Sequence, residues 1–152
     1  MRFIAMVRAT AASEAEEGPV PDDASLLSDM IAFNDRMVQA GVMLAGEGLQ
    51  PSRTGARVRF SGDKRSVIDG PFSETKELIA GFWILRVQSR EEAIEWIKQS
   101  PNPFPGMESE IEIRRIYEDE DFGDALTPEL REAEARQREQ MARGQQQNAT
   151  SP

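Results

Sequence analysis

The chain has 152 residues, 39% hydrophobic and 30% charged, with a net charge of −9; this composition is typical of a globular domain, and the acidic balance argues against nucleic-acid binding, which requires a concentrated basic surface. It contains no cysteine and no histidine, which excludes disulfides, thiolate nucleophiles, the common zinc sites and a Ser-His-Asp triad within one chain. The N-terminal apolar run at 3–7 is too short for a signal sequence or a membrane span, so we expect a cytoplasmic protein with no membrane partner. Because histidine and cysteine are absent, we also expect no metal, and we expect no cofactor.

The first half of the chain is predicted to form a strand, a helix and a second strand. Residues 3–7 are continuously apolar over the length of a strand, and a polar loop follows at 10–23. Apolar residues at helical spacing then predict a helix that is capped by Asp22 or Asp23 and stops at Gly41. We expect its core-facing stripe to consist of Leu27, Met30, Ile31, Met37 and Val38. A second strand begins at Val42, and glycines interrupt its regularity at 46 and 48.

The second half of the chain is predicted to form a hairpin, a strand, a helix and a last strand. Short strand patterns at 56–60 and 65–68 are joined by a turn sequence. The run at 79–87, rich in Ile, Phe and Trp, is the strongest strand pattern in the chain. Ser89 and Glu92 form a capping box that opens the second helix, which is terminated by prolines at 101 and 103. Alternating isoleucines and charged residues predict the last strand at 111–116.

This order of elements predicts the fold. The pattern β-α-β, hairpin, β-α-β is that of an α+β protein with the ferredoxin-like split β-α-β arrangement, in which both helices cover one face of an antiparallel sheet. The other face of such a sheet is bare, and many strand residues here are apolar on both sides. We therefore expect a two-fold homodimer in which sheet packs against sheet.

The last quarter of the chain differs in composition from the rest. Residues 118–152 hold nine acidic and four basic residues, a net charge of −5. Thr127 and Pro128 are suited to the start of a third helix with only a thin apolar stripe. We predict three parts: a domain at 1–124, a C-terminal helix at 125–143 and a disordered tail at 144–152. The acidic extension is a candidate contact for a protein partner.

Several linked motifs resemble one family of proteins. The run Asp69-Gly70-Pro71-Phe72 is followed by Glu74-Thr75-Lys76-Glu77 and Gly81-Phe82-Trp83, and it is preceded by Ala45-Gly46-Glu47-Gly48-Leu49. In this order, the motifs resemble the YCII-related (DGPF-domain) family of small bacterial proteins over about residues 1–124. The resemblance implies a dimeric ferredoxin-like α/β-barrel with a pocket between sheet and helices.

The resemblance also bears on function. Genes of this family often lie beside those of extracytoplasmic-function sigma factors, which implies a regulatory role. Some members have been proposed as enzymes because they carry a His-Asp pair. This chain has no histidine, so that assignment cannot be transferred to it.

Two carboxylates and one lysine are candidates for a site. Asp69 either closes its turn by accepting backbone hydrogen bonds or serves as an acid-base group. Glu47 lies between two glycines, where the backbone can approach a ligand closely, although an exposed loop glutamate fits equally well. Lys76 could bind an anionic ligand or pair with a neighbouring carboxylate such as Glu74. We hypothesise that Asp69, Glu47 and Lys76 line one pocket.

Two functions fit these residues. The first is a non-catalytic ligand-binding or regulatory homodimer, with a small organic acid as a candidate ligand. The alternative is a cofactor-independent isomerase or lyase acting on a small, mostly apolar acid, with Asp69 or Glu47 transferring the proton. Lys76 or Arg59 would then neutralise the developing negative charge, unless Arg59 belongs to a solvated strand face. Phe72 and Trp83 complete the candidate ligand-binding residues, although Trp83 could equally pack in the core or at the dimer interface.

Overall fold

The computed structural model describes residues 1–15 and 24–149 of the chain. The chain divides into two compact units, Met1–Ile116 and Tyr117–Pro152. Part of the loop expected at 10–23 and both candidate helix caps, Asp22 and Asp23, lie outside the described residues.

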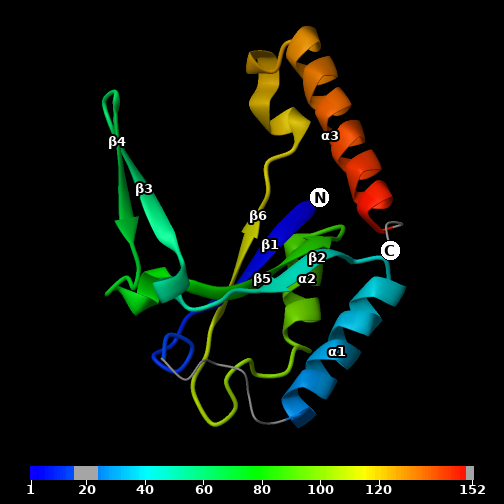
Figure 1. Ribbon diagram of the computed structural model, residues 1–152. Helices are drawn as coiled ribbons and strands as arrows, with labels where there is room; N and C mark the ends of the chain where they lie inside the picture. The colour runs from blue at the N-terminus through cyan, green and yellow to red at the C-terminus, as the bar shows by residue number, and fades with distance from the viewer. Residues whose placement is uncertain (16–23, 150–152) are drawn as a thin grey trace. The chain divides into compact units, whose positions relative to one another are not determined.

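The first unit is built on a four-stranded sheet with the order β2-β5-β1-β6, in which every neighbouring pair is antiparallel. The strands are Arg2–Arg8 (β1), Met43–Gly48 (β2), Ile79–Arg86 (β5) and Ile111–Arg115 (β6). Two helices, Ala24–Gln39 (α1) and Arg90–Ile97 (α2), cover one face of this sheet (Figure 1). The predicted α+β fold with an antiparallel sheet is confirmed, and the strand order is consistent with the split β-α-β arrangement. Strand β2 includes Gly46 and ends at Gly48, and the irregularity in its pairing with β5 lies between Met43 and Ala45.

The hydrophobic core lies between the sheet and the helices. Alternate residues of β1, namely Phe3, Ala5 and Val7, are buried, as the two-residue period of a strand requires. Phe33 of α1 is fully buried and meets the Trp83 ring edge to face, with ring centroids 5.9 Å apart. These contacts fix α1 against β5.

The predicted core stripe of α1 is partly wrong. Met37 is buried and Met30 packs against the core, but the buried face of the helix is otherwise formed by Leu26 and Phe33. Leu27, Ile31 and Val38 are exposed. Both sets have helical spacing, and they lie on adjacent faces because one residue corresponds to a rotation of about 100°. Periodicity alone could not decide which of two neighbouring apolar stripes faces the sheet.

The start of α2 follows its predicted capping sequence. The Ser89 hydroxyl accepts a hydrogen bond from the Glu92 backbone N–H at 3.1 Å. The Glu92 carboxylate reaches back to the Gln88 N–H at 2.7 Å rather than to that of Ser89. The Ser89 hydroxyl thus satisfies one of the free N–H groups of the first turn, and the reciprocal bond of the capping box goes to Gln88 instead of Ser89.

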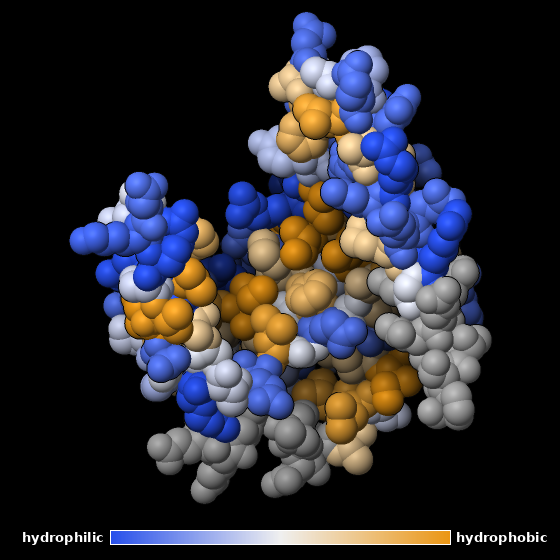
Figure 2. Space-filling view, turned by 45° about the horizontal axis from the view of Figure 1, so that its top comes forward, coloured by the Kyte–Doolittle hydropathy of each residue, from blue (hydrophilic) through white to orange (hydrophobic). Residues whose placement is uncertain are grey.

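A separate hairpin joins β2 to β5. Its strands, Ala56–Ser61 (β3) and Lys64–Asp69 (β4), pair with each other and extend beyond the sheet on the side away from α1 and α2 (Figure 1). The cross-strand pair Val58 and Val67 is 54% and 68% exposed, and Phe60 on the same face is 69% exposed. Figure 2 shows apolar surface on this hairpin and on the sheet beside it.

The base of the hairpin explains the Asp-Gly-Pro-Phe sequence. Gly70 lies so close to the 3₁₀ turn Ser52–Thr54 that an added Cβ would be 1.8 Å from the Ser52 carbonyl oxygen. Its N–H donates to the Gly55 carbonyl at 2.9 Å, and a cis peptide bond links it to Pro71. The Phe72 N–H donates to the Ser52 hydroxyl at 3.1 Å. The motif therefore closes the hairpin onto its neighbouring loop.

The second unit contains a 3₁₀ segment, Asp119–Ala125, and a long helix, Pro128–Ala149 (α3). The Thr127 hydroxyl accepts from the Leu130 N–H at 3.4 Å, as the predicted cap requires. Arg138 pairs with Asp119 at 3.0 Å, which ties the two elements together. This unit begins at Tyr117, so the predicted boundary at 124 lies inside it. The helix also runs to Ala149, into the segment expected to be a disordered tail, while 150–152 lie outside the described residues.

No helix among the described residues is long and apolar enough to cross a membrane.

Candidate functional site

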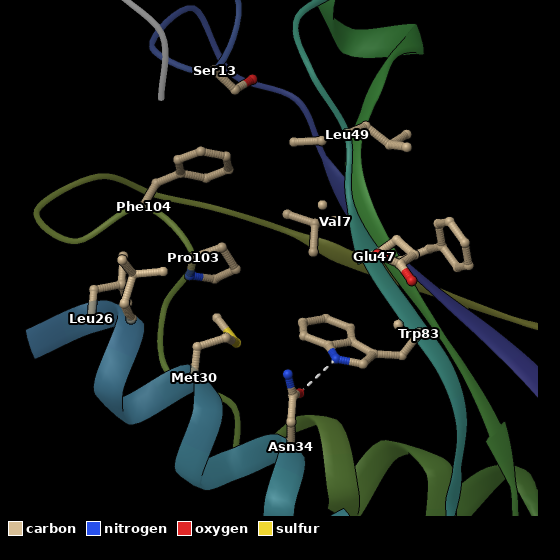
Figure 3. A pocket seen from close by; sticks show the side chains of 15 residues that line it. Val7, Ser13, Leu26, Met30, Asn34, Glu47, Leu49, Trp83, Pro103 and Phe104 are labelled. Atoms are coloured by element: carbon tan, nitrogen blue, oxygen red, sulfur yellow. Dashed lines mark hydrogen bonds between the residues drawn. The ribbon is translucent and has the colours of Figure 1, made fainter. Parts of the chain in front are cut away.

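A cavity of about 320 Å³ lies between α1 and the β2–β5 side of the sheet (Figure 3). This volume is within the range of small-molecule sites. Apolar side chains from five parts of the chain line it, together with the polar residues Ser13, Asn34 and Glu47. The lining residues are Val7, Ser13, Leu26, Leu27, Met30, Asn34, Gly46, Glu47, Gly48, Leu49, Ala80, Phe82, Trp83, Pro103 and Phe104.

The indole of Trp83 forms one wall of this cavity, and its orientation is fixed from three sides. Phe33 packs against the ring edge to face. The indole N–H donates to the Asn34 side-chain oxygen at 2.9 Å. Gly46 on the neighbouring strand leaves room for the ring, because an added Cβ would lie 2.7 Å from the Trp83 Cδ1 atom. Trp83 is thus a core residue, as one of the predicted alternatives has it, and it also forms a wall of the cavity.

The polar groups of the cavity are few. Ser13 is 2% exposed, and its hydroxyl donates to the Thr10 carbonyl and accepts from the Thr10 N–H, both at 2.9 Å. The Glu47 carboxylate is exposed and lies on the opposite side of β2 from the Trp83 ring (Figure 3). This placement agrees with the pairing of Glu47 with Phe82, the outward neighbour of Trp83. Glu47 therefore borders the cavity without directing its charge into it.

Three other predicted residues lie together at a second, separate depression of about 440 Å³ at the base of the hairpin. Asp69, Arg59 and Phe72 line it, and the Arg57 guanidinium stacks over the Phe72 ring at 4.0 Å. Asp69 is exposed, and within the part of the chain that the structure describes its carboxylate accepts no hydrogen bond. The interpretation that Asp69 closes its turn by hydrogen bonding is therefore wrong. The turn is held instead by Gly70 and Ser52.

Lys76 is exposed on the short 3₁₀ turn Thr75–Glu77 and lines neither of these cavities. Its backbone carbonyl accepts a hydrogen bond from Arg8, and its ammonium forms no ion pair with any described residue. Contrary to the hypothesis drawn from the sequence, the structure thus does not bring Asp69, Glu47 and Lys76 into one pocket. Glycines adjoin Glu47 and Asp69, but Gly46 makes room for the Trp83 ring and Gly70 closes the hairpin base, so they do not form a shared site.

Asn34 is a polar cavity residue that was not among the candidates from the sequence. Asparagine is unfavourable inside a helix because its side chain competes for backbone hydrogen bonds. An asparagine in the middle of α1, on the turn after Met30, was therefore a usable signal for a specific role.

The described residues place little charge at the cavity. In the part of the chain that the structure describes, no lysine or arginine lines it, and the one lining carboxylate, that of Glu47, faces away. Among the described residues there is no cluster of three acidic side chains that could hold a metal ion. An apolar molecule with a hydrogen-bonding group matches these walls.

Comparison with known proteins agrees with the sequence motifs. The model of the YCII-related domain family matches residues 1–118. An uncharacterized protein of Rhizobium meliloti (strain 1021) is 32% identical over 95 residues, which cover 62% of this chain and 76% of that protein.

Proposed function

Because this chain belongs to the YCII-related family, we propose that it is a non-catalytic homodimer of the dimeric α/β-barrel type that binds a small, largely apolar ligand. The observation that carries this proposal is the cavity between α1 and the sheet, which is walled mainly by apolar side chains and into which no described residue directs a charged group. Binding energy in such a cavity comes from the apolar area that the ligand removes from water.

The enzymatic alternative is less well supported. Proton transfer requires a carboxylate with a perturbed environment within reach of the substrate. Glu47 directs its carboxylate away from the cavity, and Asp69 is exposed at the separate depression. Arg59 lies beside Asp69 and cannot neutralise charge on a ligand in the cavity.

A regulatory role would use ligand binding as its input. The link to sigma factors rests on the family resemblance alone. The second unit offers a surface for a protein partner, since Tyr117, Phe122, Leu130 and Met141 are exposed among its acidic residues.

The dimer is supported by two uncovered apolar surfaces of the first unit. On the sheet face without helices, Ile4 pairs with Ile84 and Met6 with Phe82. The hairpin adds the exposed face containing Val58, Phe60 and Val67. A two-stranded hairpin is at best marginally stable by itself, so its apolar face needs a cover. A second copy of the chain is the partner we propose, because the hairpin is basic, through residues such as Arg57 and Arg59, whereas the whole chain carries a net charge of −9.

Light scattering tests the assembly. We expect twice the mass of one chain for the natural protein and a shift toward the monomer for Phe60→Asp, which places a charge on the apolar face of the hairpin. Ser66→Asp is the matched control, since Ser66 pairs with Arg59 on the other face. A monomeric natural protein, or equal behaviour of the two variants, contradicts the proposed interface.

Ligand binding is tested by thermal shift with small aromatic probes, because a ligand that binds only the native state raises the melting temperature. The variant Leu27→Trp places an indole at the cavity wall and should abolish the shift. Ile31→Trp is the control, because Ile31 is exposed one turn further along α1 and does not line the cavity. If no probe shifts the natural protein, or both variants respond like it, the cavity is not a binding site.

A further inference from the structure

The hydrogen bond between Trp83 and Asn34 determines which polar group the cavity offers. An indole nitrogen can only donate, so the Asn34 atom 2.9 Å from it must be the carbonyl oxygen Oδ1. The side-chain nitrogen Nδ2 carries both hydrogens of the Asn34 amide. It has no hydrogen-bond partner among the described residues, and it points into the cavity (Figure 3).

This orientation is held by packing rather than by chance. The Trp83 ring cannot turn away, because Phe33 stands edge-on against it and the backbone at Gly46 lies close to it. A Cβ at position 46 would lie 3.2 Å from the same indole nitrogen that Asn34 accepts from. The amide of Asn34 is therefore presented as a fixed donor at an apolar wall.

The remaining lining residues restrict the charge of the ligand. No cation of the described part of the chain lines the cavity: Arg59 lies at the other depression, and Lys76 lines neither site. A ligand carboxylate would have to give up its hydration without a counter-charge, which is costly. This disfavours the small organic acid that the sequence analysis suggested.

On this basis, which rests on the proposed ligand-binding function, we propose that Asn34 is the specificity-determining residue and that the cavity selects uncharged aromatic molecules with a carbonyl oxygen. A carbonyl oxygen accepts from the Asn34 amide and brings no hydrogen that needs a partner of its own. The aromatic part would lie between Trp83 and the apolar side chains of α1, such as Met30.

A matched series of probes tests the proposal with the full chain. Acetophenone carries the carbonyl, α-methylstyrene has nearly the same shape without an acceptor, and benzoate carries a charge. We expect acetophenone to bind about three- to tenfold more tightly than α-methylstyrene, as one neutral hydrogen bond predicts, and benzoate to bind most weakly. The naphthyl counterparts of the three compounds form a second series of larger size.

Two variants identify the group responsible. Asn34→Asp keeps an oxygen to accept from Trp83 but removes the donor, so the preference for acetophenone should vanish or reverse. Gln39→Leu removes an exposed amide from the same helix, away from the cavity lining, and should keep the preference. In amide-detected NMR, the side-chain signals that Asn34→Asp removes should shift with acetophenone and stay unchanged with α-methylstyrene.

The outcomes separate this inference from the function on which it rests. Equal binding of acetophenone and α-methylstyrene, tighter binding of benzoate, or an unchanged preference in Asn34→Asp overturns the role of Asn34 but leaves a binding cavity. If no member of either series binds, the proposed ligand-binding function fails and the inference fails with it.

Discussion

Replacing Gly70 by alanine should destabilise the protein more than any other glycine-to-alanine change at the hairpin base. The added methyl carbon would lie 1.8 Å from the carbonyl oxygen of Ser52, 2.7 Å from its carbonyl carbon and 3.2 Å from the Cα of Arg53. All three are backbone atoms, so no side-chain rotation can relieve the overlap. The turn Ser52–Thr54 and the hairpin must move apart.

The magnitude follows from what this movement disrupts. Overpacking against well-ordered structure costs roughly 1–3 kcal/mol. The movement also weakens the hydrogen bonds from Gly70 to Gly55 and from Phe72 to Ser52, each contributing about 1 kcal/mol. We therefore expect a loss of about 3 kcal/mol in the free energy of unfolding, with a melting temperature lower by about 10 °C.

Urea denaturation of the Gly70→Ala and Gly55→Ala variants measures this effect against a matched control. Gly55 lies at the same junction, but its added Cβ would be in ordinary contact, 3.5 Å from the Ser52 carbonyl oxygen. Its replacement should change the stability by less than about 1 kcal/mol. If Gly70→Ala unfolds like the natural protein, the close approach of the hairpin base to Ser52 is wrong.

Three further predictions concern the core, the Asp69 carboxylate and the second unit. Phe33→Ala should lower the free energy of unfolding by about 3–5 kcal/mol in urea denaturation, because Phe33 is fully buried against Trp83; a loss below about 1 kcal/mol would contradict this packing. Asp69→Asn should leave both the melting temperature and probe binding unchanged, because the carboxylate is exposed and lies outside the cavity; loss of binding would restore Asp69 as a site residue. A chain ending at Tyr117 should keep a cooperative melt close to that of the full protein, because the ion pairs of Asp119 lie within the second unit; a large loss of stability by calorimetry would show that this unit supports the first.

The elements themselves were largely determined by local sequence. Strand-length apolar runs, the Ser89 cap and the turn between β3 and β4 depend on interactions within a few residues, which a single sequence displays. The order of these elements also limits the topology to few arrangements, so the antiparallel sheet with both helices on one face could be predicted. The family motifs point to the same fold.

What only the tertiary structure decided is which of these residues meet. On α1, two apolar stripes satisfy the same period, and contact with β5 buries Phe33 rather than Ile31. Glu47 and Asp69 share a plausible chemistry and glycine-rich surroundings, yet strand alternation turns Glu47 outward and the hairpin carries Asp69 to another depression. Asn34 acquires its role only through Trp83, which lies 49 residues away in the chain. Contacts between distant segments depend on how the sheet and helices pack, and local sequence patterns do not contain that information.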